Sequence, residues 1–390
     1  MNVQMITNQH ELLALCERVR AAPRVGLDTE FHNERSYTAR LMLLQLAFED
    51  GTAIVDPLAV ADLRPLAEAL CETVVVGHAL TSDLKIFADR FGLVPPRVFD
   101  CQIAAAFLGY GMAISLADLV RDLTSVRLKK SQTVSDWSAR PLSENQIEYL
   151  IDDVVHLLDM HDTLVARLQK NGRYEWALEE CAALADVKKY QTDERRLYMR
   201  IPGSNRMNRR ELGILLELAT LRDRIARERD LPLKYVMPDD VIAGLATLRP
   251  KRVEDLAQLR RLDAGTRRTL GAAMIEAVGR GEALSEERLP HKSPRPLGNA
   301  RETLASLMGV VAGEIAREHE LPPSLLVPRS TLERVAREVP ADRVALEEAL
   351  DLTAWRTGLI AGPLWRLLSG ESALRIEGYA GGDPRITVQS

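Results

Sequence analysis

Residues 25–31 read VGLDTEF and set two carboxylates, Asp28 and Glu30, into an otherwise apolar run. Alternation of side chains along a strand places these carboxylates on one face and Val25 and Leu27 on the other. An acidic pair on a strand usually marks a solvated edge, but this run opens a series of three predicted strands and reads as a central one. Two carboxylates in the middle of a sheet need binding partners, because an unpaired buried charge is costly.

The strands and helices around this run predict the fold class. Apolar strands are predicted at 24–30, 40–48, 52–55 and 73–77. Helices are predicted at 8–21, 62–71 and 82–91, and then at about 100–109, 115–122, 143–169 and 175–189. An antiparallel start that continues into strand–helix–strand units indicates an α/β domain, with a mixed sheet flanked by helices.

Two further places on the chain add acidic side chains and a tyrosine. Asp83 opens the helix predicted after a buried strand, and Tyr149 and Asp153 are four residues apart, on one face of another helix. Taken singly, each has a common structural explanation, such as a first-turn acid stabilised by the helix dipole. Taken together with Asp28 and Glu30, converging carboxylates would repel one another unless cations lie between them. The set therefore predicts a divalent-metal site.

Phosphodiester hydrolysis is the reaction that such a site favours. Two hard cations roughly 3.5–4 Å apart can stabilise both the attacking and the leaving oxygen of an in-line displacement. Mg²⁺ or Mn²⁺ suits carboxylate ligands. Tyr149 would hold and orient the attacking water, since an ordinary tyrosine pKa of about 10 makes its hydroxyl a poor base.

The second half of the chain contains an internal repeat. Residues 225–232 read IARERDLP and residues 315–322 read IAREHELP, and the match continues through a second proline in each copy. Turn-forming sequences separate the copies from each other and from the first part of the chain. We therefore expect an α/β domain, two small all-α domains and a tail, at 1–200, 206–289, 297–375 and 376–390.

The charge distribution limits where a polyanion could bind. The formal net charge of −5 gives no general attraction to polyanions, so any nucleic-acid contact has to come from a local patch. Residues 201–300 carry an excess of Lys and Arg. Their arginines, among them Arg222, Arg227 and Arg261, could bind phosphates or be paired on a solvated helix surface.

Cysteine spacing and the absence of apolar runs bear on location. The four cysteines lie far apart and read as free thiols in a reducing compartment. The chain has no secretory signal pattern and no apolar run of membrane-spanning length. We expect a cytoplasmic monomer that does not bind a membrane.

The acidic motifs, in their order, resemble those of a known family. DTE at 28–30, HALTSDL at 78–84 and YLIDD at 149–153 resemble the three exonuclease motifs of the DEDD superfamily, tyrosine subtype. DTEF and SDWSARPL (135–142) are similar to ribonuclease D in particular, and the helical repeats resemble two HRDC domains. The resemblance covers nearly the whole chain. One departure is Asp152, which stands where a small residue is expected and adds negative charge.

This resemblance implies a ribonuclease H-like fold and a 3′→5′ exoribonuclease. The implied substrate is structured RNA, such as a tRNA precursor with a 3′ extension, and the implied products are nucleoside 5′-monophosphates. Two divalent cations, Mg²⁺ or Mn²⁺, are the implied cofactors, and no organic cofactor is expected. Four carboxylates are implied as metal ligands and one tyrosine as the water-orienting residue: Asp28, Glu30, Asp83 and Asp153, and Tyr149. Phe31 and His78 are implied as neighbours of the terminal nucleotide.

Two other functions stay open. A DNA-directed 3′→5′ exonuclease of the same architecture would lack a contact to the 2′-hydroxyl. No single residue of the sequence indicates such a contact. A catalytically silent nucleic-acid-binding protein is disfavoured, because all five motif positions hold competent residues. Which helical repeat binds nucleic acid also stays open, since the second could serve only to pack and stabilise.

Overall fold

The computed structural model describes residues 2–128, 136–291, 297–377 and 385–389. The first part of the chain forms a six-stranded sheet, whose strands are β1 (Val3–Ile6), β2 (Arg24–His32), β3 (Arg40–Phe48), β4 (Gly51–Val55), β5 (Val74–Gly77) and β6 (Val98–Asp100). Their order is β1-β4-β3-β2-β5-β6, with β2 antiparallel to β3 and parallel to β5. The prediction of a mixed sheet is confirmed. β1 and β6 escape prediction, because strands of four and three residues are too short to show side-chain alternation.

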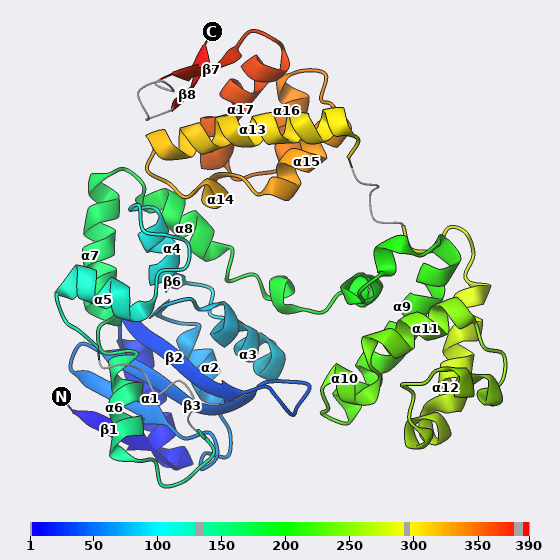
Figure 1. The fold of residues 1–390 in the computed structure, drawn as a ribbon. Helices are drawn as coiled ribbons and strands as arrows, with labels where there is room; N and C mark the ends of the chain where they lie inside the picture. Colours follow the sequence, from blue (N-terminus) through cyan, green and yellow to red (C-terminus); the bar gives the residue numbers. More distant parts are fainter. Residues whose placement is uncertain (1, 129–135, 292–296, 378–384, 390) are drawn as a thin grey trace.

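Helices pack on both faces of this sheet (Figure 1). They are α1 (Gln9–Ala21), α2 (Arg64–Leu70), α3 (Thr81–Phe91), α4 (Cys101–Ala106), α5 (Leu116–Thr124), α6 (Glu144–Asp152), α7 (Leu157–Lys170) and α8 (Tyr174–Ala182). Three 3₁₀ segments follow, η1 (Val187–Tyr190), η2 (Glu194–Arg200) and η3 (Ser204–Arg206). The prediction of one helix at 143–169 is wrong, because a turn that no Gly or Pro marks separates α6 from α7. That turn begins at Asp153, the C-cap of α6.

Strand β2 and helix α7 approach each other closely at Gly26. A Cβ at this position would lie 2.9 Å from the Cβ of Ala47 and 3.3 Å from the Cδ1 of Leu157, so a larger residue would push the helix away. On the other face of β2, Val25 and Leu27 are fully buried in the apolar cluster that α1, α2 and α3 complete. Gly26 thus lets α7 lie directly against β2, which sets the turn before α7 beside the acidic half of the strand.

The second half of the chain forms two helical parts with the same order of elements. The first contains α9 (Arg209–Glu228), α10 (Leu233–Val236), α11 (Asp239–Leu248), the 3₁₀ segment η4 (Val253–Gln258) and α12 (Ala264–Ala283). The second contains α13 (Asn299–Glu318), α14 (Pro323–Leu326), α15 (Arg329–Glu338), α16 (Arg343–Leu350) and α17 (Ala354–Leu368). The segment expected to be a tail contributes to a two-stranded antiparallel sheet of β7 (Ala373–Glu377) and β8 (Arg385–Gln389).

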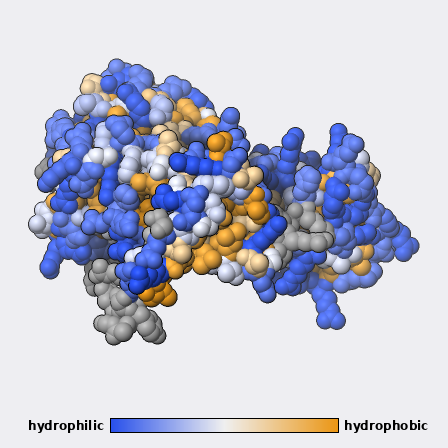
Figure 2. Space-filling view, turned by 90° about the horizontal axis from the view of Figure 1, so that it is seen from above, coloured by the Kyte–Doolittle hydropathy of each residue, from blue (hydrophilic) through white to orange (hydrophobic). Residues whose placement is uncertain are grey.

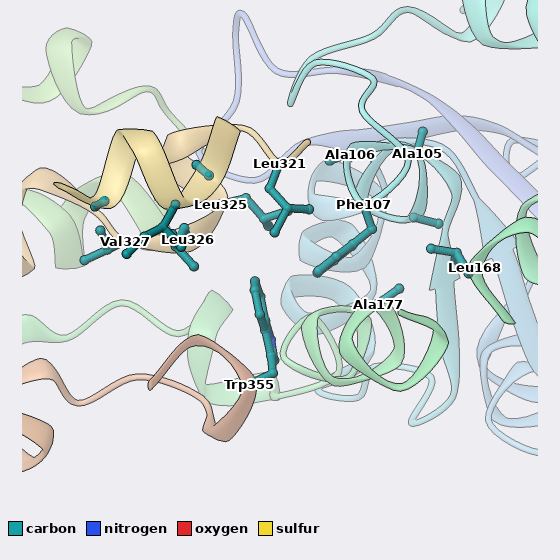
Figure 3. Close-up of a cluster of buried hydrophobic side chains, with 14 of the residues drawn as sticks. Ala105, Ala106, Phe107, Leu168, Ala177, Leu321, Leu325, Leu326, Val327 and Trp355 are labelled. Atoms are coloured by element: carbon teal, nitrogen blue, oxygen red, sulfur yellow. The ribbon is translucent and has the colours of Figure 1, made fainter. Parts of the chain in front are cut away.

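The two helical parts contact the first part of the chain in different ways. In the second, Trp355 packs against Phe107 and Trp176, within a buried apolar cluster that joins both parts (Figure 3). The first instead makes polar contacts with the β2–β3 loop, where the Tyr37 hydroxyl donates to Oδ1 of Asp223 at 2.7 Å. The second helical part is therefore fixed to the α/β part by buried apolar surface.

Hydrophilic residues cover most of the face seen from above in Figure 2, and the hydrophobic residues in view gather toward its middle. Among the described residues, no helix combines the length and the apolar content needed to cross a membrane.

Candidate active site

Three of the four predicted carboxylates converge in the structure. Asp28, Glu30 and Asp153 each offer an oxygen, and these oxygens all lie within 4.8 Å of one another. The first two come from one face of β2, as the period of two predicts, and the third from the C-cap of α6. Residues more than 120 positions apart in the sequence are thus brought to one point by the packing of α6 and α7 on the sheet.

Asp83 lies beside this set rather than within it. It is buried in the first turn of α3, and its Oδ1 accepts a hydrogen bond of 2.5 Å from the hydroxyl of Thr29. Thr29 stands between Asp28 and Glu30 on β2, so the bond ties α3 to the acidic strand. Asp83 is near enough for its charge to help raise the pKa values of both neighbouring carboxyls.

All four carboxyl groups resist ionisation in the protein alone. Burial, followed by the charges of Asp83, Asp153 and Glu30, raises the pKa of Asp28 well above its usual value. Burial and the charges of Asp153 and Asp83 raise the pKa of Glu30 to about 8. Burial is also the largest cause that raises the pKa of Asp153 to about 7 and that of Asp83 to about 6. Asp152 adds to the rise at Asp153, as its position in the sequence predicts.

The donor set fits a divalent cation. Clustered carboxylate oxygens are the ligands that Mg²⁺ and Mn²⁺ prefer, and a cation would relieve the repulsion that raises these pKa values. Gln45, the cross-strand partner of Asp28, is fully buried, and its amide has no hydrogen-bond partner among the described residues. A buried, unpartnered amide next to an acidic cluster is typical of a polar site that is completed by something other than protein.

Tyr149 lies one turn before Asp153 on α6, and its hydroxyl hydrogen-bonds the carboxylate of Asp153. Burial, followed by the charges of Asp153, Glu30 and Asp28, raises the pKa of Tyr149 far above its usual range. In the metal-free protein the hydroxyl therefore stays protonated at neutral pH, which suits a residue that orients a water.

The two residues predicted to contact the terminal nucleotide lie on β2 after Glu30 and in the turn before α3, the helix that carries Asp83. Phe31 follows Glu30 directly on β2, is half-buried and packs against the apolar cluster on the other face of the sheet. His78 precedes α3, and its buried Nε2 has no hydrogen-bond partner among the described residues. Burial lowers the pKa of His78, so its ring is neutral at neutral pH.

One of the predicted phosphate-binding arginines has a structural role instead. Arg222 is 5 % exposed and donates to the carbonyl of Met237 at 3.0 Å and to Oδ1 of Asp239 at 2.6 Å. Arg227 is paired with Asp223 at 2.9 Å. Arg222 thus joins α9 to the start of α11, whereas Arg227 is half-exposed and pairs within α9.

Asp100 is a buried residue that sequence reasoning misses. Its carboxylate accepts hydrogen bonds from the amides of Ala79 (3.1 Å) and Leu80 (2.8 Å), in the turn that starts α3. It also caps α4 through the amides of Gln102 and Ile103. Leu80, whose side chain cannot accept a hydrogen bond, occupies the N-cap of α3, and Asp100 binds its amide and that of the preceding residue from another element. Asp100 is the first residue of the helix predicted at about 100–109, and in the structure it is the N-cap of α4.

Replacing Asp100 with Ala should lower the free energy of unfolding by about 2–5 kcal/mol, because it leaves four amides at the starts of two helices, one buried and three part-buried, without this acceptor. Urea-induced unfolding measures the change. Asp186→Ala is a matched control, since it removes an exposed cap with a single bonded amide, Lys188, and should cost about 1 kcal/mol. An Asp100→Ala loss no larger than that of the control would contradict the double-cap interpretation.

Comparison with known proteins agrees with this geometry. A family model described as 3′-5′ exonuclease matches residues 3–169, and one described as HRDC domain matches residues 211–278. Ribonuclease D of Granulibacter bethesdensis is 35 % identical over 96 % of this chain and 94 % of its own length. Ribonuclease D of Escherichia coli is 32 % identical over 86 % of this chain and 90 % of its own.

A solved structure supports the same assignment across the fold. The crystal structure of Escherichia coli RNase D, described as an exoribonuclease involved in structured RNA processing, superposes with a TM-score of 0.83 at 30 % identity. The match covers 95 % of this chain and 99 % of that one, and so includes the α/β part and both helical parts. The chain belongs to the ribonuclease D family of 3′→5′ exoribonucleases.

Proposed function

We propose that this enzyme shortens structured RNA from its 3′ end, acts on tRNA precursors with a 3′ extension, and releases nucleoside 5′-monophosphates. The observation that carries the proposal is the convergence of Asp28, Glu30 and Asp153, with Asp83 and Tyr149 beside them. The relation to Escherichia coli RNase D, which is described as processing structured RNA, supports RNA over DNA as the substrate.

Asp28, Glu30, Asp83 and Asp153 would hold two divalent cations, Mg²⁺ or Mn²⁺. When bound, such ions stabilise negative charge on the attacking and leaving oxygens of the scissile phosphodiester. Among the described residues, no lysine or arginine forms an ion pair with these four carboxylates, and the oxygens that converge suit cations. Tyr149, protonated and tied to Asp153, would hold the attacking water on the side of the last phosphodiester. Phe31 and His78 would contact the terminal nucleotide.

The repeated order of helices supports a division into an exonuclease domain at 1–200 and two HRDC-like domains at 206–289 and 297–375, followed by the segment 376–390. The first helical domain would then contact RNA, because the excess of basic residues lies there and the second is occupied by its apolar contact with the exonuclease domain.

Incubation of a tRNA carrying a labelled 3′ extension tests the proposal. With Mg²⁺ or Mn²⁺ the extension should shorten one nucleotide at a time and yield nucleoside 5′-monophosphates, and EDTA should stop the reaction. A DNA strand of the same sequence should be degraded more slowly. Internal fragments, nucleoside 3′-monophosphates or faster digestion of the DNA would contradict the proposal.

A further inference from the structure

The segment that leads into α6 is the one motif of the sequence that the reaction leaves without a role. Of the string SDWSARPL, residues 136–142 are described and Ser135 lies outside the described residues, as do Lys129 and Lys130. The segment ends at Ser143, whose side chain and Gln146 form a capping box at the start of α6. The position of this segment therefore determines where α6 begins. It also affects where Tyr149, which lies on α6, is placed.

Arg140 binds this segment to the sheet with its whole guanidinium. Nε and Nη2 donate to the two carboxylate oxygens of Asp56, at 2.6 and 2.8 Å. Nη2 also donates to the carbonyl of Met42 on β3 at 3.1 Å. Nη1 donates to the carbonyls of Trp137 at 2.7 Å and Ala139 at 2.8 Å. All five N–H groups of the side chain therefore donate a hydrogen bond.

The partner of Arg140 is itself fixed. Asp56 follows β4 directly, is 5 % exposed, and also accepts from the amide of Leu58 at 2.9 Å. Burial would raise the pKa of its carboxyl, but the hydrogen bonds from Arg140 and Leu58 hold that pKa below its usual range. Asp56 is therefore a rigid, charged anchor at the end of a core strand.

Trp137 links the Arg140–Asp56 pair to the active site, because it contacts both Arg140 and Tyr149. Its ring is 7 % exposed, and its centroid lies 5.7 Å from that of the Tyr149 ring, with the planes at 33°. The same small cluster includes Met42 and Leu43 of β3 and Leu150 of α6. The contacts form a chain from Asp56 through Arg140 and Trp137 to Tyr149.

We propose that Arg140 is a positioning residue for the exonuclease reaction, whose bidentate pair with Asp56 fixes Trp137 and the start of α6 and so places the Tyr149 hydroxyl. The proposal rests on the role given to Tyr149. The hydrogen bonds of Arg140 go to Asp56, Met42, Trp137 and Ala139, and none goes to a carboxylate of the acidic cluster. Its effect is therefore on the rate of the bound complex rather than on RNA affinity.

Arg140→Lys in the full-length protein tests the proposal, since lysine keeps the charge but cannot form the forked contact. We expect kcat to fall about 10- to 100-fold with KM within about twofold, because a small displacement of an orienting group weakens catalysis without weakening binding. In a Tyr149→Phe background the same substitution should change kcat by less than about twofold, because the hydroxyl that Arg140 places is absent. Arg24→Lys is the matched control: Arg24 also lies on the sheet and pairs with Asp162 and Glu49, and kcat should stay within about twofold.

An equal loss of kcat in both backgrounds would overturn the proposal, as would a loss confined to KM. If Arg140→Lys fails to fold, Asp56→Asn provides the same test, since its amide oxygen still accepts hydrogen bonds from Leu58 and Arg140. A tyrosine-dependent loss of kcat in that variant supports the proposal, and a loss independent of Tyr149 contradicts it. If Tyr149→Phe alone leaves kcat unchanged while Asp28→Asn abolishes it, the role of Tyr149 fails and the metal-dependent function stands.

Discussion

Replacement of Asp28 by Asn is expected to reduce kcat on the order of 10³–10⁴-fold and, at the same time, to raise the melting temperature of the metal-free protein. Asp28 is the carboxylate on which burial and three other acidic groups act together. Without the Asp28 carboxylate, the remaining oxygens can neither hold cations in the same way nor stabilise charge in the transition state. When catalytic residues act as one unit, the loss of one of them lowers kcat by a factor of this size.

The rise in stability follows from the same repulsion. In EDTA the folded protein has to keep Asp28, Glu30 and Asp153 together, whereas the unfolded chain separates them. A neutral amide of nearly the same shape removes one of the charges that burial and repulsion disfavour, so the folded state gains. A loss of activity that accompanies a gain in stability is typical of residues retained for function.

Single-turnover kinetics on 3′-labelled RNA and thermal unfolding, each with and without Mg²⁺, measure both effects. Mg²⁺ should raise the melting temperature of the wild type more than that of the Asp28→Asn variant, because only a ligand that binds the folded state stabilises it. RNA binding should stay largely intact. Asp159→Asn, an exposed acid on α7, is the control and should change neither quantity appreciably. Undiminished Mg²⁺-dependent digestion by the Asp28 variant would end the metal-site interpretation.

Replacement of Trp355 by Ala is expected to lower the free energy of unfolding by about 3–5 kcal/mol and to release the second helical part from the exonuclease part. The Trp355 ring stacks on Trp176, with centroids 5.0 Å apart and planes at 14°, and meets Phe107 edge-on at 5.2 Å. Its Nε1 donates to Glu180 at 3.3 Å, and the neighbouring Arg356 donates to the same carboxylate at 2.5 Å. Figure 3 shows Trp355 and Phe107 facing each other across the contact.

Chemical unfolding and hydrogen exchange of α17 measure this change. Val344, which is 66 % exposed on the same helical part, provides the control, and Val344→Ala should cost less than about 0.5 kcal/mol. The rate on a short single-stranded RNA should stay within about twofold, because the ring and hydrogen-bond partners of Trp355 are Phe107, Trp176 and Glu180 and not the carboxylates of the metal site. Equal stability of both variants would show that the apolar contact does not hold the two parts together. A point substitution is a cleaner test than removal of residues 206–390, which would expose Phe107 and Trp176.

Local geometry explains which parts of the site the sequence predicts. Asp28 and Glu30 on a strand, and Tyr149 and Asp153 on a helix, are related by spacings of two and four residues, so each pair shares a face whatever the rest of the fold does. The predicted strands at 24–30 and 40–48 are long enough to be recognised by their apolar content, and both are present in the sheet.

What the sequence does not predict depends on contacts between distant segments. Three contacts join residues that are 54, 20 and 84 positions apart. They are the hydrogen bond from Thr29 to Asp83, the hydrogen bond from the Leu80 amide to Asp100, and the ion pair of Arg140 with Asp56. No periodicity encodes such contacts. The break between α6 and α7 is of the same kind: no Gly or Pro marks it in the sequence, and Leu157 at the start of α7 lies against Gly26 of β2.

Anomalous diffraction from crystals soaked in Mn²⁺ locates the cations themselves. We predict anomalous peaks at bonding distance from carboxylate oxygens of Asp28, Glu30 and Asp153, with a further contact from Asp83, and loss of these peaks in crystals of the Asp28→Asn variant. Active enzyme whose Mn²⁺ peaks lie away from these four side chains, or unchanged peaks in the variant, would show that the acidic cluster is not where the cations act.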